Sequence, residues 1–162
     1  MNGSNGSNGN LSACGGATPD CVNGYCTDIN AISWVITGEG NWSGASNWSS
    51  NSVPGYNSIA TINPGGVAVL DGEFALYKLI NNQGTIKGNG TLHFARIENN
   101  GSFSPGNSPG VINIMGDYIS TPNAEIIIEI ENETTFDILN ISGSASLDGL
   151  LTINLLNGFT PS

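Results

Sequence analysis

The amino-acid sequence predicts an all-β fold, and three observations support that class. The 162-residue chain contains 23 Gly and takes most of its polarity from Asn, Gly, Ser and Thr, which favour turns over helix. Its apolar runs are short and rich in Ile, Val and Leu, as strands are. No window of about a dozen residues has the 3.6-residue apolar period of an amphipathic helix. The length is sufficient for one domain with a continuous core.

The chain is acidic and poor in charge. Lys and Arg total 3 against 13 Asp and Glu, a net charge of −10, and charged residues make up 10% of the chain, against roughly 25% in ordinary domains. So few cations cannot neutralise many phosphates, and we expect no nucleic-acid binding. No stretch approaches the roughly 18 apolar residues of a membrane span, so we expect no membrane insertion. This composition is typical of extracellular and cell-surface proteins.

Residues 1–31 are predicted to be a flexible Gly/Asn/Ser linker followed by an arm, separate from a folded domain at 32–162. All cysteines of the chain lie in this first part: Cys14, Cys21 and Cys26. In a secreted chain they suggest one local disulfide and one thiol left to cross-link another chain. A three-cysteine metal site is the rival interpretation, and it lacks a nearby His or fourth Cys.

Short strands at close intervals are predicted in the first half of the folded domain. The expected strands are 58–62, 67–70, 74–79, 84–87, 91–95 and 96–99. Two comparable steps, 82–86 and 99–103, lie 17 residues apart, a little under the roughly 20 residues of the shortest common solenoid repeats. In a solenoid each turn of chain adds one rung and hides its inward residues by stacking on the next. The frequent Asn-Gly and Asp-Gly pairs also suit hairpins, so a β-sandwich is the alternative architecture.

Two Ser-Pro-Gly units, 104–106 and 108–110, are separated only by Asn107. Each is a predicted turn, because Pro fixes φ near −65° and Gly accepts positive φ. A strand pattern follows at 111–115, with Ile112 and Ile114 on the opposite face from their neighbours, and residues 116–117 are expected to break it.

The segment 124–131 also alternates as a strand does. Its sequence, AEIIIEIE, places Ile127 on an otherwise acidic face. A single exposed Ile is unremarkable, but Ile127 is also a candidate contact with a neighbouring subunit.

These motifs resemble repeats of bacterial secreted proteins, the autotransporter-passenger and related β-helix family. The resemblance covers roughly 32–162 and has three parts. The first is a Trp-rich start with matching positions Trp34, Gly40, Trp42, Asn47, Trp48 and Pro54. The second is the pair of Ser-Pro-Gly units with the Gly-Asp-Tyr step at 116–118. The third is a closing segment with matches at Asp137, Ser142, Gly143, Leu147, Asp148, Gly149, Leu150, Gly158, Phe159 and Pro161. The resemblance implies a short parallel β-solenoid on the cell exterior, built for display or adhesion rather than chemistry.

The tryptophans allow two interpretations. Exposed rings at Trp34, Trp42 and Trp48 would form a carbohydrate-binding face, because aromatic rings stack on sugars. Alternatively, the rings cap the open end of the solenoid and shield its core, since a Trp buries well over ~150 Å². We favour the cap.

Few residues suggest chemistry. The one histidine, His93, lies on a predicted strand, where an ordinary rung residue is expected. Paired carboxylates in a polysaccharide-cleaving groove would have to come from Asp117, Glu125, Glu129 and Glu131. A solvated acidic face is the simpler interpretation. We predict no catalytic residue, no metal and no cofactor.

The sequence therefore predicts a non-catalytic, extracellular structural or adhesive surface protein. Because a short solenoid has open ends with unpaired strand edges, we expect its partner to be itself, in a fibre or surface layer. The second hypothesis is a carbohydrate-binding module that uses Trp42 and Trp48. The third is a polysaccharide-degrading β-helix enzyme, and we rank it last.

Overall fold

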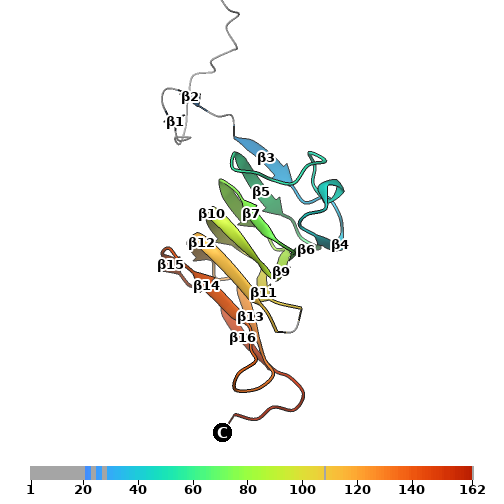
Figure 1. Ribbon diagram of the computed structural model, residues 1–162, viewed down its shortest axis with the longest axis vertical. Coiled ribbons are helices and arrows are strands. Elements are labelled where there is room, and N and C mark those ends of the chain that lie inside the picture. Colours follow the sequence, from blue (N-terminus) through green and yellow to red (C-terminus); the bar gives the residue numbers. More distant parts are fainter. Residues whose placement is uncertain (1–20, 23–24, 27–28, 108, 162) are drawn as a thin grey trace, which may run out of the picture.

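The protein is a short parallel β-solenoid. The computed structural model describes residues 21–22, 25–26, 29–107 and 109–161. Apart from a separate two-stranded antiparallel pair, β1 (Cys21–Val22) and β2 (Tyr25–Cys26), its sheet strands pair in parallel. Rungs stack in sequence order along the long axis, from blue to red in Figure 1. The predicted solenoid is confirmed, and the alternative sandwich with antiparallel hairpins is wrong.

Two sheets form the walls of the solenoid. The eight-stranded sheet consists of β3 (Asn30–Ser33), β5 (Ser58–Ile62), β7 (Glu73–Ala75), β8 (Lys78–Asn81), β10 (Gly90–Asn99), β12 (Val111–Ser120), β14 (Ile138–Ile141) and β15 (Ala145–Ser146). The six-stranded sheet consists of β4 (Gly38–Asn41), β6 (Gly66–Leu70), β9 (Thr85–Gly88), β11 (Ser102–Pro105), β13 (Glu125–Ile130) and β16 (Leu150–Leu155). The chain alternates between the walls, so each rung contributes strand to both.

The predicted 17-residue step is confirmed for one rung. Thr85 pairs with Ser102 and Ile86 with Phe103. At the preceding corner the offset is 18, because Asn81 pairs with Asn99. The additional residue is accommodated at the corner between β8 and β9, where Gln83 has a φ of 62°.

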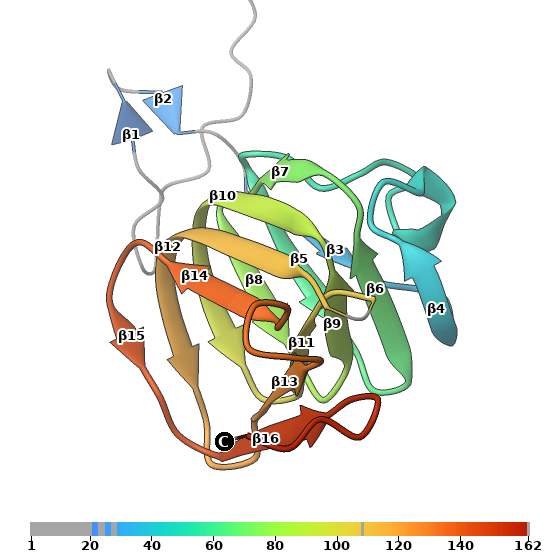
Figure 2. The same cartoon turned by 60° about the horizontal axis from the view of Figure 1, so that its bottom comes forward.

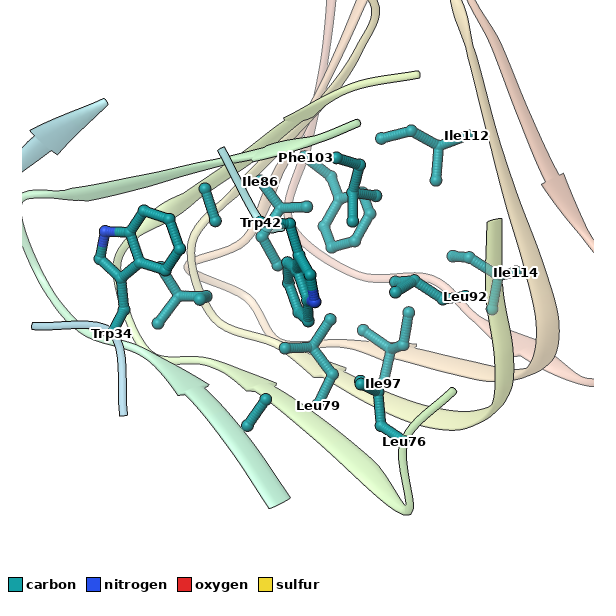
Figure 3. Close-up of a cluster of buried hydrophobic side chains, with 14 of the residues drawn as sticks. Trp34, Trp42, Leu76, Leu79, Ile86, Leu92, Ile97, Phe103, Ile112 and Ile114 are labelled. Carbon is teal, nitrogen blue, oxygen red and sulfur yellow. The ribbon is translucent and has the colours of Figure 1, made fainter. Parts of the chain in front are cut away.

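The core is built from ladders of inward side chains at matching positions of successive rungs. Ala60, Leu79, Ile97 and Tyr118 form one such ladder, and all four are fully buried. On the facing sheet, Ala68, Ile86 and Phe103 form another, also fully buried. Figure 3 shows side chains from both walls meeting between the sheets. As predicted, Ile112 and Ile114 point into this core while Val111, Asn113 and Met115 face outward.

Three strand divisions differ from the prediction. The strands expected at 91–95 and 96–99 form one continuous strand, β10. The expected strand at 74–79 is divided into β7 and β8, and β12 continues through residues 116–117, where a break was expected. The register of β10 and β12 shifts there, because His93 pairs with Met115 but Arg96 pairs with Asp117. β10 therefore has one more residue than β12 across this step, which is a β-bulge that bends the strand without ending it.

A ladder of buried amides holds one corner of the solenoid. Asn81 Nδ2 donates to Asn99 Oδ1 (2.8 Å), and Asn99 Nδ2 donates to the Tyr118 hydroxyl (2.8 Å). The same amide oxygens accept the backbone N–H groups of Gly84 and Gly101 (3.1 Å each). Both asparagines are fully buried, so each of these polar groups depends on its protein partner.

We predict that Asn99→Ala lowers the free energy of unfolding by about 2–3 kcal/mol, because it removes the partners of Gly101 N–H and the Tyr118 hydroxyl and leaves Asn81 Nδ2 with Ser102 O as its acceptor. Urea denaturation measures the change. Asn140→Ala is the matched control, since Asn140 is exposed and donates to Asn113 on the outer surface (2.8 Å). The control is expected to change stability by less than about 0.5 kcal/mol. Equal effects of the two substitutions would contradict the role of the buried ladder.

Candidate functional site: the ends of the solenoid

The three indole rings pack together in the core at the N-terminal end. Trp42 and Trp48 are fully buried, and Trp34 is 3% exposed. Trp48 contacts both other rings edge-to-face, with centroid distances of 5.0 Å to Trp34 and 4.7 Å to Trp42. Trp48 Nε1 also donates to the Trp42 carbonyl oxygen (2.9 Å). Figure 3 shows Trp34 and Trp42 among the side chains of the later rungs.

The chain around Trp48 folds back over the first strand. Val35 N donates to Asn47 O (2.9 Å) and Ser49 N donates to Ser33 O (2.8 Å), so the segment after the short helix η1 (Ala45–Asn47) pairs beside the end of β3. Gly66 leaves space for this arrangement, because a Cβ there would lie 2.6 Å from Trp34 Cδ1. The N-terminal end is thus covered by the chain itself.

This burial overturns the carbohydrate-face interpretation of the tryptophans. A ring stacks on a sugar only through an accessible face, and Trp34, Trp42 and Trp48 offer none. The rings lie where a cap would, over the inward residues of the first rungs. Sequence patterns left both interpretations open, since ring exposure depends on how the segment folds back.

The C-terminal end, in contrast, exposes its apolar side chains to solvent. Most of the large exposed apolar side chains among the described residues belong to it: Phe136, Ile138, Leu147, Leu150, Leu151, Ile153 and Leu155. Figure 2 turns this end forward, where β16 (red) crosses below β13. The exposed fraction is 61% for Leu151 and 60% for Leu150.

The exposure follows from the end of a ladder. Phe103 is fully buried, Ile126 in the next rung is half-buried, and Leu151 in the last rung is mostly exposed. Each residue is covered by the rung that follows, and no described residues follow β16 in the ladder. A hollow of about 180 Å³ at this end is lined by Ile126 and by residues 147–151.

The last strand also has an open edge. Within the described residues β16 pairs with β13 and with no other strand, so one side of its backbone has no sheet partner. The strand itself, LLTINL, carries no charge. Acidic groups surround it, with Glu133 and Asp148 exposed and Glu131 half-buried. The C-terminal end is an apolar surface with an acidic rim.

A loop connects β11 to β12, and a distant carboxylate holds it in place. The turn predicted at 104–106 begins later than expected, because Ser104 and Pro105 end strand β11, and the second predicted turn includes Ser108, which lies outside the described residues. Gly106 has the predicted positive φ, 88°, and exchanges backbone hydrogen bonds with Gly88 (2.7 and 3.1 Å). Gly110 is required for space, because a Cβ there would collide with the Asn89 side chain. Asp137 Oδ1 accepts Gly110 N–H (2.7 Å), and its Oδ2 accepts Glu129 N–H (2.9 Å).

Burial raises the pKa of Asp137 above its ordinary value of 3.8. The hydrogen bonds from the backbone of Glu129 and Gly110 lower the pKa, and the nearby Glu129 charge raises it, but desolvation is the largest effect. Asp137 is 4% exposed and lies beneath the loop, where it joins β13 to the start of β12. The sequence resemblance singled out this position but not its partners.

The other predicted positions are scattered. Ile127 is half-buried in β13 beside Thr152 of β16, and its role as a subunit contact stays a prediction. The backbone pairs Cys21 with Cys26, while Cys14 and the cysteine side chains lie outside the described part of the structure, so the disulfide stays a prediction.

The candidate acids do not converge. Asp117 lies in the eight-stranded sheet and accepts Ser144 N–H (2.8 Å), whereas Glu125, Glu129 and Glu131 belong to the other wall or follow it. Glu125 accepts a hydrogen bond from Thr152, and Glu131 from Asn157 (3.0 Å). These hydrogen bonds connect the acids to neighbouring segments of the chain, as structural contacts do.

The histidine lies on the outer surface beside an acid, with His93 Nε2 at 3.3 Å from Glu73 Oε2. In the described ranges, no three His, Cys, Asp or Glu side chains gather as metal ligands would. The same part of the chain contains no helix with the length and apolarity to cross a membrane.

Comparison with known proteins places the chain in a family. The family described as the B subunit of the Discoidin-inducing complex matches residues 25–160, which is most of the chain. The chain belongs to this family. It is also 32% identical over 72 residues to an extracellular serine protease of Serratia marcescens, a match that covers 44% of this chain and 7% of that protein. No solved structure matches the chain.

We predict that Trp48→Ala lowers the free energy of unfolding by about 3–5 kcal/mol, because it empties the centre of the cap. Trp48→Phe keeps a ring but loses the hydrogen bond to Trp42, and is expected to destabilise the protein less. Thermal and urea unfolding measure both. A Trp48→Ala protein of wild-type stability that had lost binding to a glycan array would restore the carbohydrate-face interpretation.

We predict a pH-dependent effect of Asp137→Asn. The folded pKa is raised, so the folded state binds the proton more tightly, and the stability contributed by Asp137 falls as pH rises from about 3.8 through the folded pKa. An Asn supplies one acceptor for two N–H donors, so the variant is less stable by about 1–3 kcal/mol. In urea denaturation from about pH 3.5 to 7, the wild-type advantage is expected to shrink as pH rises. A growing advantage would contradict the direction of the shift.

Proposed function

We propose that this chain is a non-catalytic structural or adhesive module of the cell exterior, and that it associates with a second copy of itself through its C-terminal end. The exposed apolar end carries the proposal. An extracellular location is supported by the match to a protein described as extracellular, and assembly by a family described as a subunit of a complex. The resemblance to secreted β-helix repeats points the same way.

The size of the surface supports association. The seven apolar side chains lie on the open face and the outer flanks of the last rung, and together they expose on the order of 600 Å², the upper end of the roughly 300–600 Å² that the largest patch of a soluble monomer covers. A standard interface buries roughly 800 Å² per partner. The exposed apolar side chains on the open face therefore supply part of the area that a stable contact needs.

The open edge of β16 suits a second copy. Two identical edge strands related by a two-fold axis pair antiparallel, and this joins the two six-stranded sheets into one. The strand has no charge to desolvate at the centre of such a contact. Each copy would also place its exposed leucines over the uncovered rung of the other.

The covered N-terminal end favours a closed pair over a fibre. A fibre requires contacts at both ends of each subunit, and the Trp cap removes the apolar surface from one of them. The acidic rim also opposes association, because two rims of like charge meet. Association is therefore expected to strengthen as salt screens this repulsion.

The enzyme hypothesis has little support. The candidate acids are divided between the two walls and engaged by neighbouring groups. We infer that the acidic surface serves solubility rather than bond cleavage.

We predict a concentration-dependent dimer that Leu151→Lys converts to monomer, because the charge would be buried unpaired at the centre of the contact. Sedimentation velocity over a concentration series, at low and high salt, measures the state. Val35→Lys is the matched control, since Val35 is 53% exposed just after β3, the first strand of the eight-stranded sheet, at the other end of the solenoid. It is expected to leave the dimer intact.

Two results would contradict the proposal. A wild-type protein that stays monomeric at all concentrations would remove the association. Equal loss of the dimer in both variants would move the contact away from the C-terminal end. Electron microscopy separates closed pairs from fibres, and long filaments would show that the Trp-capped end also takes part.

A further inference from the structure

A groove of about 620 Å³ lies on the outer face of the eight-stranded sheet, over its first rungs and away from the C-terminal end. It is lined by Ile29, Ile59, Tyr77, Lys78, Arg96 and Glu98. Its volume is in the range of small-molecule sites, roughly 300–1,000 Å³. The parallel register brings these residues together, since Ile59 pairs with Lys78 and Lys78 with Arg96 in successive rungs.

The groove concentrates the scarce positive charge of the protein. The chain has only 3 Lys and Arg against 13 acids, and Lys78 and Arg96 line this one groove. Glu98 lies between them, 2.7 Å from Lys78 Nζ and 3.6 Å from Arg96 Nε. One carboxylate thus faces two cations. Asp117, next to Arg96 in register, is engaged by the Ser144 N–H.

The guanidinium of Arg96 has N–H donors available for a ligand. Its side chain is 59% exposed, and its Nε lies 3.6 Å from Glu98 Oε1, which is beyond hydrogen-bond distance. Among the described residues, Glu98 is the one acidic side chain that forms an ion pair with Arg96. The guanidinium nitrogens form a planar fork that fits a carboxylate with two parallel hydrogen bonds.

The rest of the groove is apolar. Ile29, Ile59 and Tyr77 are half-buried along its wall, so each keeps an accessible hydrophobic surface. A hydroxyl-rich sugar would find few polar partners there. An apolar body with one acidic group would place that group on Arg96 and its body against the isoleucines and the tyrosine ring.

We propose that this groove binds a small organic acid, namely one carboxylate on an aromatic or aliphatic body. Arg96 receives the carboxylate, Lys78 adds positive potential, and Ile59 and Tyr77 hold the body. Glu98 keeps the Lys78 side chain in place and weakens the field that the ligand meets. The site is independent of the association at the C-terminal end.

The test uses 3-phenylpropionate as the probe and 3-phenylpropionamide as its uncharged match. Titration of the full-length protein followed by NMR chemical shifts is expected to show saturable binding of the acid, with shifts at Tyr77 and the neighbouring rungs. The amide is expected to bind at least about tenfold more weakly, because it lacks the charge that Arg96 receives. Binding is expected to weaken with salt.

Three variants locate the site. Arg96→Gln is expected to weaken binding of the acid about tenfold or more, while Glu98→Gln is expected to tighten it by removing the competing carboxylate. Lys87→Gln is the matched charge control, because Lys87 lies on the other sheet and pairs with Glu39 (2.6 Å). It is expected to leave affinity unchanged. Circular dichroism checks that each variant is folded.

The proposal is overturned by any of three results. These are no saturable shift with the acid, equal affinity for acid and amide, or equal losses in Arg96→Gln and Lys87→Gln. If Glu98→Gln increases the affinity for the acid, a structural role of the ion pair alone does not explain the increase. That result supports Arg96 as the partner of the carboxylate and Glu98 as the charge that opposes binding.

Discussion

The structure depends on the stacking of one rung upon the next. No rung of this chain closes around its own hydrophobic interior, so an inward side chain becomes dry only when residues of the following rung lie above it. The ladder through Phe103, Ile126 and Leu151 shows the effect within one sheet, because burial decreases step by step toward the last strand. The stability of each residue is therefore determined by its position along the stack as much as by its type.

A solenoid must cover its apolar core where the stack ends, and it must satisfy backbone polar groups where the chain turns. At the N-terminal end the chain supplies three large rings and folds a segment back over β3. At the corners it buries polar groups instead, with Asn81 and Asn99 satisfying backbone N–H groups that the turn leaves unpaired. Asp137 does the same for the Ser-Pro-Gly loop, although a carboxylate must be buried there. These groups hold the corners in register while the apolar ladders supply the driving force.

Much of this arrangement could be predicted from the sequence, because strand alternation and turn chemistry are local. The strand at 58–62, the inward face of Ile112 and Ile114 and the 17-residue step between Thr85 and Ser102 follow from such local patterns. The burial of the tryptophans does not follow from local patterns, since it depends on the path of the loop after β4. The contacts of Asp137 with Gly110, and the pairing of Lys78 with Arg96, depend on rung offset. That offset varies from 17 residues at Thr85 to 28 at Ala31, because the connecting loops differ in length.

The contrast between the two ends also determines the order in which the rungs are expected to unfold. A chain of stacked units loses structure from whichever terminus holds its last unit least firmly. In this protein the indole cluster secures one terminus, while β16 makes sheet contact with β13 alone among the described strands. Fraying would thus travel from β16 toward β3, and backbone amide exchange would slow progressively in the same direction. A partner bound at β16 would then slow the opening of every rung behind it, so a contact at one face would regulate the persistence of the whole stack.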